Sequence, residues 1–200
     1  MHDGLLRVVS ATPPIQVANC PYNAQQIIAV VNQAAENQVS AIVFPVLCLT
    51  GYTCGDLFFQ QTLLTSALNG LETILKELKQ EDIICIVGLP IKVETNLYNC
   101  AAVCYHGKLL GIVPKTNLVD QGGLNETRYF CTAPTYRDIM LCNQTVPFGT
   151  NIIFACDTLT EFQFGVEICK DIWVTEPPSN VLAKEGATVI FNLSASPEVL

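Results

Sequence analysis

Three segments of the sequence join residues capable of covalent chemistry to the ends of apolar runs. They are residues 44–56, 113–116 and 165–171; the second contains Lys115 and the third Cys169. A thiol that attacks an amide needs a base to form the thiolate and a cation near the developing oxyanion. Cys169 is therefore the candidate nucleophile and Lys115 the candidate oxyanion or proton partner. Cys169 alone is weak evidence, because a lone buried cysteine is more often an inert core residue.

Helices and strands that alternate along the first half of the chain must position these segments. The periodicity of apolar residues predicts a βαβαβ order at residues 5–11, 22–38, 40–49, 57–80 and 82–93. Residues 97–105 and 108–113 then alternate between polar and apolar and flank His106-Gly107, which predicts a tight hairpin.

The second half of the chain is less regular. Residues 114–149 have weak periodicity, three prolines and three glycines, so we expect functional loops there. Further strands are predicted at 151–156, 161–169 and 188–193, with a short helix at 181–185. The order of elements predicts one α/β domain with a mixed sheet.

Composition excludes several classes of partner. The chain has 200 residues, half of them hydrophobic, and a net charge of -8 without a basic patch, which argues against nucleic acid and anionic membranes. The longest apolar run, residues 41–49, is about half of the roughly 20 residues that a membrane-spanning helix needs. The first residues lack the features of a signal peptide, so we expect a cytoplasmic protein with free thiols. No CxxC pair is present, and a metal site is not expected.

Four motifs carry a family resemblance. TGYTCGDLF, PKTNL, GVEICKDIWVTEPPS and FNLSAS occur in this order at residues 50–58, 114–118, 165–179 and 191–196. Together they resemble signatures of the amidase (glutaminase) domain of glutamine-dependent NAD+ synthetases, in the carbon-nitrogen hydrolase (nitrilase-like) superfamily.

The resemblance implies a four-layer αββα sandwich that continues beyond Leu200, so we expect the domain to be incomplete at its C-terminus. It implies a Glu-Lys-Cys catalytic trio, in which Cys169 is the nucleophile that forms a thioester with glutamine. Ammonia would pass to a separate C-terminal synthetase domain, absent here, which would bind ATP and Mg; no cofactor is implied for this domain. The resemblance also implies homo-oligomers. The matching site positions are Lys115, the supporting carboxylate Glu126 and the substrate-binding positions Tyr52, Gln121, Lys170, Trp173 and Ser196.

The sequence departs from the family pattern at the site itself. Val46 stands where the family has its general-base glutamate, and valine cannot accept a proton. We therefore expect Lys115 to lack a carboxylate opposite it and glutaminase activity to be impaired or absent. Lys170 replaces a glutamate that helps hold the substrate ammonium, and Gln121 and Leu124 replace aromatic pocket residues.

Three functional hypotheses remain open. The chain is an active glutaminase, a non-catalytic amidase-like module or gene fragment that serves in binding or assembly, or a stand-alone nitrilase-like amidase for another small amide. If the chain is a non-catalytic module, Val46 is an ordinary core residue, and Glu126, Lys170 and Asp171 can be interpreted as solvated surface charges.

Overall fold

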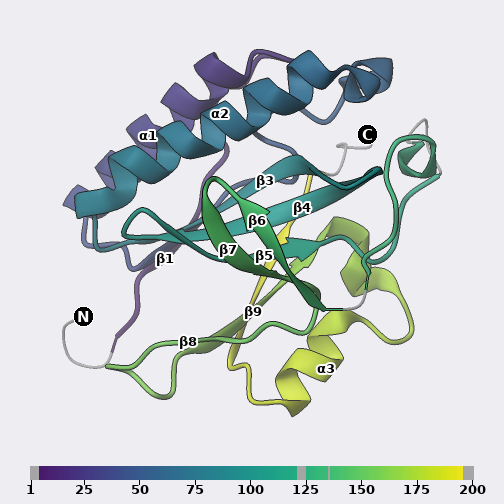
Figure 1. The fold of residues 1–200 in the computed structure, drawn as a ribbon. Coiled ribbons are helices and arrows are strands. Elements are labelled where there is room, and N and C mark those ends of the chain that lie inside the picture. Colours follow the sequence, from purple (N-terminus) through teal and green to yellow (C-terminus); the bar gives the residue numbers. More distant parts are fainter. Residues whose placement is uncertain (1–4, 121–124, 135, 196–200) are drawn as a thin grey trace, which may run out of the picture.

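The chain folds into four layers. The computed structural model describes residues 5–120, 125–134 and 136–195. Helices α1 (Cys20–Glu36) and α2 (Gln61–Glu77) cover one face of a seven-stranded sheet, and a three-stranded sheet packs on its other face. Helix α3 (Pro178–Lys184) lies on the outside of the smaller sheet (Figure 1). The predicted αββα sandwich is confirmed.

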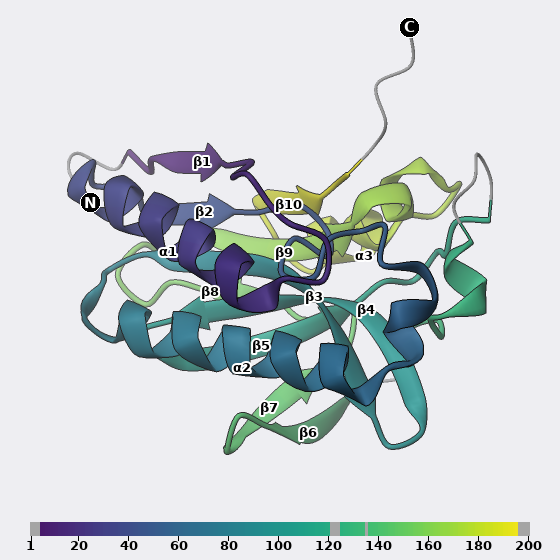
Figure 2. The same ribbon diagram turned by 90° about the horizontal axis from the view of Figure 1, so that it is seen from above.

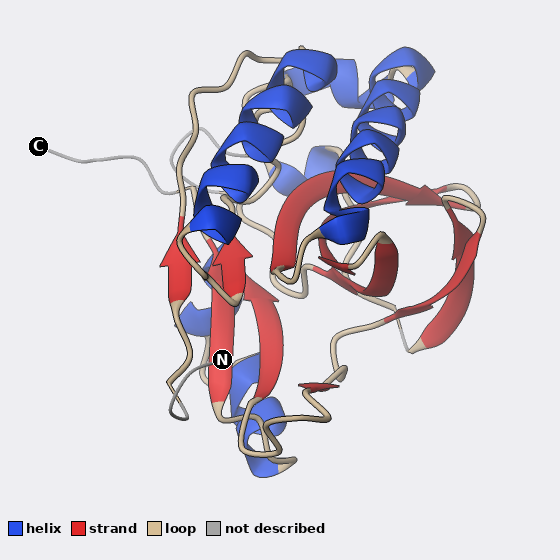
Figure 3. Cartoon of the chain, turned by 90° about the vertical axis from the view of Figure 1, so that its left-hand side faces the viewer, coloured by secondary structure: helices blue, strands red, loops and turns tan. Residues whose placement is uncertain are grey.

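The first half of the chain forms the predicted βαβαβ unit. Strands β1 (Val8–Ser10), β2 (Ala41–Val43) and β3 (Ile84–Val93) pair in parallel, so their carboxyl ends meet at one edge of the sheet. Asn19 caps α1 by accepting a hydrogen bond from the backbone N–H of Tyr22. Each long helix buries one apolar face; Figure 3 shows the two helices side by side against the sheet.

Two predicted elements of this unit are shorter than expected. The strand predicted at 40–49 is confined to β2, because a turn follows in which Leu47 has a φ of 52°. The helix predicted at 57–80 is divided into the 3₁₀ helix η1 (Gly55–Phe59), helix α2 and the 3₁₀ helix η2 (Leu78–Gln80).

The predicted hairpin after β3 is confirmed. Strand β4 (Asn96–Tyr105) pairs antiparallel with β3 and with β5 (Lys108–Pro114). His106 and Gly107 connect β4 to β5 with φ angles of 47° and 73°, as a type I′ turn requires at both central positions.

The prediction of loops throughout residues 114–149 is wrong for its second part. Strands β6 (Arg137–Leu141) and β7 (Gln144–Phe148) form an antiparallel hairpin at the edge of the large sheet. Its turn places Cys142 and Asn143 at φ angles of 47° and 59° without a glycine. Pro147 within β7 also weakened the strand signal. β7 lies between β5 and the edge strand β6, but its register with β5 covers only Phe148, so Pro147 is outside that ladder.

The smaller sheet has the order β10-β9-β8 and packs against the larger sheet (Figure 2). It consists of β8 (Phe154–Ala155), β9 (Gln163–Ile168) and β10 (Val189–Leu193); β8 is shorter than the strand predicted at 151–156. Aromatic rings fill the core of this sheet: the Phe154 and Phe164 rings are stacked with centroids 4.9 Å apart. Across the sandwich, a Cβ atom on Gly111 of β5 would lie 2.9 Å from the Phe154 ring, so the glycine makes room for it. Within the described ranges, no helix has the length and apolar character to cross a membrane.

Candidate active site

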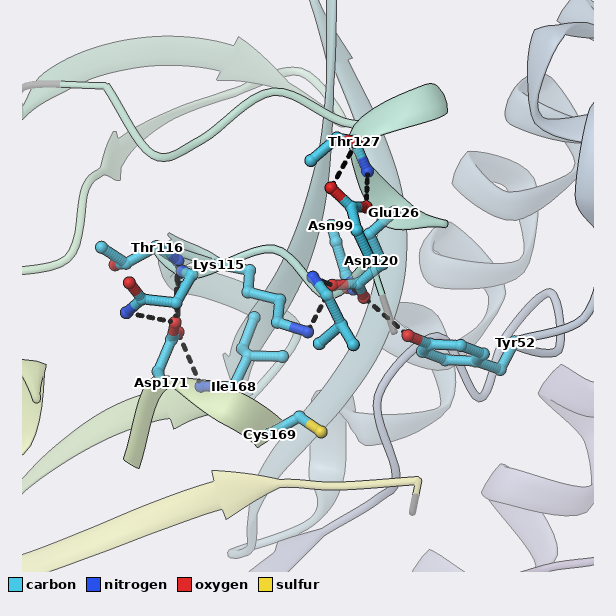
Figure 4. Close-up of polar contacts among 12 residues, drawn as sticks. Tyr52, Asn99, Lys115, Thr116, Asp120, Glu126, Thr127, Ile168, Cys169 and Asp171 are labelled. Atoms are coloured by element: carbon cyan, nitrogen blue, oxygen red, sulfur yellow. Dashed lines mark hydrogen bonds and ion pairs between the residues drawn. The ribbon is translucent and has the colours of Figure 1, made fainter. Parts of the chain in front are cut away.

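The three segments singled out in the sequence lie at the carboxyl ends of strands. Residues 44–50 follow β2, Lys115 follows β5 and Cys169 follows β9. Strand β5 runs in the same direction as β2, because two antiparallel pairings separate it from β3. Figure 4 shows the Cys169 side chain beneath the Lys115 ammonium, on the side that faces Tyr52. The fold therefore brings residues from both sheets to one place.

A buried ion pair forms the centre of this cluster. The Nζ atom of Lys115 lies 2.6 Å from Oε2 of Glu126, and the two residues are 0% and 3% exposed. The expectation that Lys115 lacks a carboxylate opposite it is wrong, because Glu126 on η3 (Glu126–Arg128) fills that role. The interpretation of Glu126 as a solvated charge is also wrong.

Glu126 accepts hydrogen bonds from four groups. Besides Lys115, the Tyr52 hydroxyl donates to Oε1 at 2.9 Å and the Asn99 amide to the same atom at 3.0 Å. The backbone N–H of Val119 donates to Oε2 at 2.8 Å. Four donors, one of them charged, occupy both carboxylate oxygens and fix the side chain in place. The geometry fits a carboxylate that holds Lys115 in place.

Tyr52 is half-buried beside this pair. Burial raises the pKa of its phenol well above the usual range, and the neighbouring Glu126 charge and the Cys169 thiol raise it further. Tyr52 is therefore a neutral donor to Glu126 at ordinary pH.

Cys169 occupies a strained position between β9 and the 3₁₀ helix η4 (Cys169–Trp173). Its φ is 50°, a left-handed conformation that costs a residue other than glycine about 1–2 kcal/mol. Such conformations persist where the surroundings fix them, and they cluster at functional sites. The Asn192 amide donates to the Cys169 carbonyl at 3.2 Å, and the side chain of Cys169 is half-buried.

Two carboxylates beside Cys169 are buried, although the sequence marked them only as flanking groups. Glu167 accepts from the backbone N–H of Ser179 and from the Asn192 amide, each at 3.2 Å. Asp171 is 1% exposed and accepts from backbone N–H groups of three residues, so its interpretation as a solvated charge is wrong. Burial raises the pKa of Asp171, and the hydrogen bonds that it accepts oppose that rise. No sequence signal separates these buried carboxylates from exposed ones.

The turn that carries Val46 is tightly constrained. Val46 is 1% exposed, and Leu47 beside it has a positive φ. Gly88 on β3 passes beneath the turn: a Cβ atom there would lie 2.4 Å from the backbone nitrogen of Leu47 and 2.6 Å from the carbonyl oxygen of Pro45. The position predicted for the general base is thus held rigidly but bears an apolar side chain.

The remaining predicted residues are less closely associated with the cluster. Lys170 is half-buried on η4, whereas Trp173 is 80% exposed and outside the buried cluster. Gln121 and Ser196 lie outside the described residues. In the part of the chain that the structure describes, no group of three or more His, Cys, Asp and Glu side chains is arranged to hold a metal ion.

A sizeable cavity lies elsewhere in the fold. It has a volume of about 1110 Å³ and is lined by residues near the amino ends of β2, β3 and β9, among them Ser40, Ile84 and Phe162. None of the predicted site residues lines it. The Cys169 cluster, by contrast, combines a thiol, a buried cation and strained backbone.

Comparisons of sequence identify relatives of this chain. The family model for carbon-nitrogen hydrolases matches residues 6–199. The glutamine-dependent NAD(+) synthetase of Mycobacterium tuberculosis H37Rv is 33% identical over 195 residues, which cover 97% of this chain and 29% of that protein. The human glutamine-dependent NAD(+) synthetase is 28% identical over 189 residues, covering 89% and 26%. The chain thus spans less than a third of the length of these relatives.

Solved structures agree. A glutamine-dependent NAD(+) synthetase from Cytophaga hutchinsonii matches with a TM-score of 0.82 and 26% identity, covering 96% of this chain and 30% of that chain. An amidase from Nesterenkonia sp. shares the fold at a TM-score of 0.73 and 16% identity, covering 94% and 64%. A mutant of that amidase, with leucine in place of a glutamate, carries the acetamide moiety of fluoroacetamide at its active-site cysteine. The chain therefore belongs to the carbon-nitrogen hydrolase family and closely resembles the N-terminal glutaminase part of glutamine-dependent NAD+ synthetases.

Proposed function

We propose that this chain is a glutaminase domain of the NAD+ synthetase type that keeps a reactive Cys169 thiol but hydrolyses glutamine poorly. The observation that carries the proposal is the distribution of carboxylates around the site. Val46 is buried and apolar at the position of the base, and Glu126 already accepts from four donors. No carboxylate among these residues is available to take the thiol proton.

The reaction would follow the chemistry of a cysteine amidase. The Cys169 thiolate attacks the side-chain amide carbon of glutamine, and the oxyanion that forms faces the Lys115 ammonium. Collapse of the tetrahedral intermediate breaks the C–N bond, and the amide nitrogen needs a proton to leave as ammonia. Water then hydrolyses the thioester to glutamate. Without a base at residue 46, proton removal from the thiol and from this water falls to solvent, which costs about 10²- to 10⁴-fold in rate.

Substrate binding is proposed to be weakened as well. Lys170 follows the nucleophile directly and is half-buried, so its ammonium would repel the α-ammonium of glutamine at short range. Tyr52 is held by Glu126 and remains available to line the pocket. The exposed Trp173 contributes only if the substrate or a partner covers it.

The partners follow from the relatives. In a longer protein of their kind, ammonia from glutamine would reach a synthetase domain that uses ATP and Mg to make NAD+, while this domain would need no cofactor. Homo-oligomers are part of the same proposal, as are a cytoplasmic location and the absence of nucleic-acid or membrane partners.

Ammonia release from glutamine tests the proposal. The chain as written is compared with Val46→Glu and with the double variant Val46→Glu/Lys170→Glu. We expect Val46→Glu to raise the rate by roughly 10²- to 10⁴-fold and the second change to raise it further at low glutamine concentration. Cys169→Ala in the Val46→Glu background is the matched control and should abolish the release.

Equal rates in the first three proteins would overturn the proposal. If none of them releases ammonia while all are folded by circular dichroism, the non-catalytic alternative holds instead. Fluoroacetamide tests the thiol separately: Cys169 would form an S–C bond and fluoride would leave. Labelling of Cys169 without turnover of glutamine would support a reactive thiol that lacks its base.

A further inference from the structure

The Lys115 and Cys169 segments belong to different sheets, so something must fix one relative to the other. Lys115 follows β5 of the large sheet and Cys169 follows β9 of the small sheet. Attack on an amide requires the cation and the sulfur to be held within a fraction of an ångström of their working geometry. The packing of two sheets alone does not specify loops that precisely.

One side chain contacts both segments. Oδ1 of Asp171 accepts from the backbone N–H of Asn117 at 2.6 Å and from its side-chain amide at 3.1 Å. Both carboxylate oxygens lie 3.2 Å from the backbone nitrogen of Thr116. Oδ2 also accepts from the backbone N–H of Ile168 at 3.2 Å. Thr116 follows Lys115 directly and Ile168 directly precedes Cys169, so a single carboxylate connects the neighbours of both groups (Figure 4).

We propose that Asp171 is a positioning residue that sets the placement of the Lys115 ammonium relative to the Cys169 sulfur. It does so through backbone N–H groups, which leaves both reactive side chains free. The bond to Ile168 also closes the turn in which Cys169 takes its left-handed conformation. The inference rests on the proposed function of this site, but its test does not require glutamine.

The burial of Asp171 supports a dedicated role. A buried carboxylate is costly unless the protein supplies partners for it, and the donors that bond to Asp171 are all N–H groups of the two segments. Burial raises its pKa, so the hydrogen bonds only partly offset the cost of desolvation. Glu167, the other buried carboxylate near Cys169, contacts Ser179 and Asn192 and does not reach the Lys115 segment.

The rate of Cys169 alkylation as a function of pH tests the proposal. Iodoacetamide is applied to the whole chain, and mass spectrometry of the Cys169 peptide separates this thiol from the nine other cysteines. The charged groups around Cys169 are Lys115 with its partner Glu126, drawn near it in Figure 4, and Lys170 and Glu167, its near neighbours in the sequence. In Asp171→Asn, one acceptor oxygen becomes an amide donor that faces backbone N–H groups. We expect a fall of about ten-fold in the alkylation rate at pH 7 and an upward shift of the pH midpoint, because Lys115 is no longer held near the sulfur.

A variant that only loses stability must behave differently. Val146→Ala removes buried volume from β7, far along the chain from either segment, and should lower the melting temperature without moving the pH midpoint. Asn117→Leu removes only the side-chain donor to Asp171 and should shift the midpoint in the same direction by a smaller amount. It also serves as the test if Asp171→Asn does not fold.

Two results would overturn the proposal. One is a folded Asp171→Asn, or failing that a folded Asn117→Leu, with the wild-type pH profile. The other is a shift of the same size in Val146→Ala. Failure of the proposed function gives a different pattern, since a chain that releases no ammonia still reports the dependence of Cys169 alkylation on Asp171.

Discussion

Lys115 and Glu126 form an ion pair with 2.6 Å between Nζ and Oε2, and both side chains are almost entirely excluded from solvent. The two residues are only eleven positions apart, yet they come from the end of β5 and from η3. Glu126 supplies the counter-charge that a lysine buried in an apolar sandwich needs. Three further donors, from Tyr52, Asn99 and Val119, hold the Glu126 carboxylate in place.

The first prediction is that separating this pair is costly. Glu126→Gln leaves the Lys115 ammonium buried without its counter-charge and should lower the free energy of unfolding by about 3–5 kcal/mol. Lys115→Met should have an effect of similar size, and the double variant should lose much less than the sum. Urea unfolding of the wild type, the two single variants and the double variant measures the coupling energy.

Glu94→Gln, which breaks the exposed pair with Arg137, is the control and should change the free energy of unfolding by less than about 1 kcal/mol. Additive losses in the double variant would contradict the argument.

The second prediction concerns Gly88 beneath the Val46 turn. Gly88→Ala places a methyl group against backbone atoms of Pro45 and Leu47, which cannot yield as a side chain would. We expect the free energy of unfolding, measured with urea, to fall by about 3 kcal/mol or more, which is the upper end of the range for overpacked cores. Gly70→Ala is the matched control: its new methyl group meets only the side chain of Leu49, at 3.2 Å, within a helix that favours alanine. Equal effects of the two substitutions would show that the turn is not constrained as described.

The sequence predicted the first βαβαβ unit and the His106-Gly107 hairpin because their periodicity and turn residues are local signals. It also predicted that Cys169 and Lys115 follow strands. The hairpin of β6 and β7 was missed, because its turn uses Cys142 and Asn143 at positive φ and its second strand contains Pro147. Local sequence does not report such choices when tertiary packing imposes them.

The polar contacts of the site were less predictable than its residues. Glu126 could be identified as a carboxylate that supports Lys115 only through the family resemblance, and its further bonds to Tyr52, Asn99 and Val119 had no signal in the sequence. The bridging role of Asp171 depends on the docking of two sheets, which no spacing along the chain encodes. The left-handed conformation of Cys169 is likewise set by its surroundings.

The third prediction is a dependence of stability on alkaline pH through Tyr52. Its pKa is raised in the folded chain, so the folded state keeps this proton above pH 10, where the unfolded state releases it. The unfolded state then binds fewer protons, and stability must fall as the pH rises above about 10. Tyr52→Phe lacks this contribution. It should be about 1–3 kcal/mol less stable at pH 7, from loss of the bond to a charged acceptor, and the two curves should converge as the pH rises.

Ultraviolet titration checks the cause of that convergence directly. At every pH at which both proteins are folded, wild type and Tyr52→Phe should show the same tyrosinate absorbance, because Tyr52 does not ionise before unfolding. A titration step near pH 10 that is present in the wild type and absent from Tyr52→Phe would contradict the burial of the phenol beside Glu126.

The last prediction separates binding from turnover at Lys170. In a Cys169→Ala background, which cannot form the thioester, calorimetry measures glutamine affinity alone. Lys170→Glu replaces a repulsive charge with an attractive one toward the substrate α-ammonium. At short range in a partly solvated site, each charge contributes on the order of 1 kcal/mol, so the affinity for glutamine should rise about ten-fold or more.

Lys184→Glu is the control: it makes the same charge change at the exposed end of α3 and should leave the affinity nearly unchanged. If both variants raise it equally, the net charge of the protein and not the position of Lys170 governs glutamine binding. If neither does, the ammonium of glutamine does not approach η4, and the substrate assigned to this site must be reconsidered.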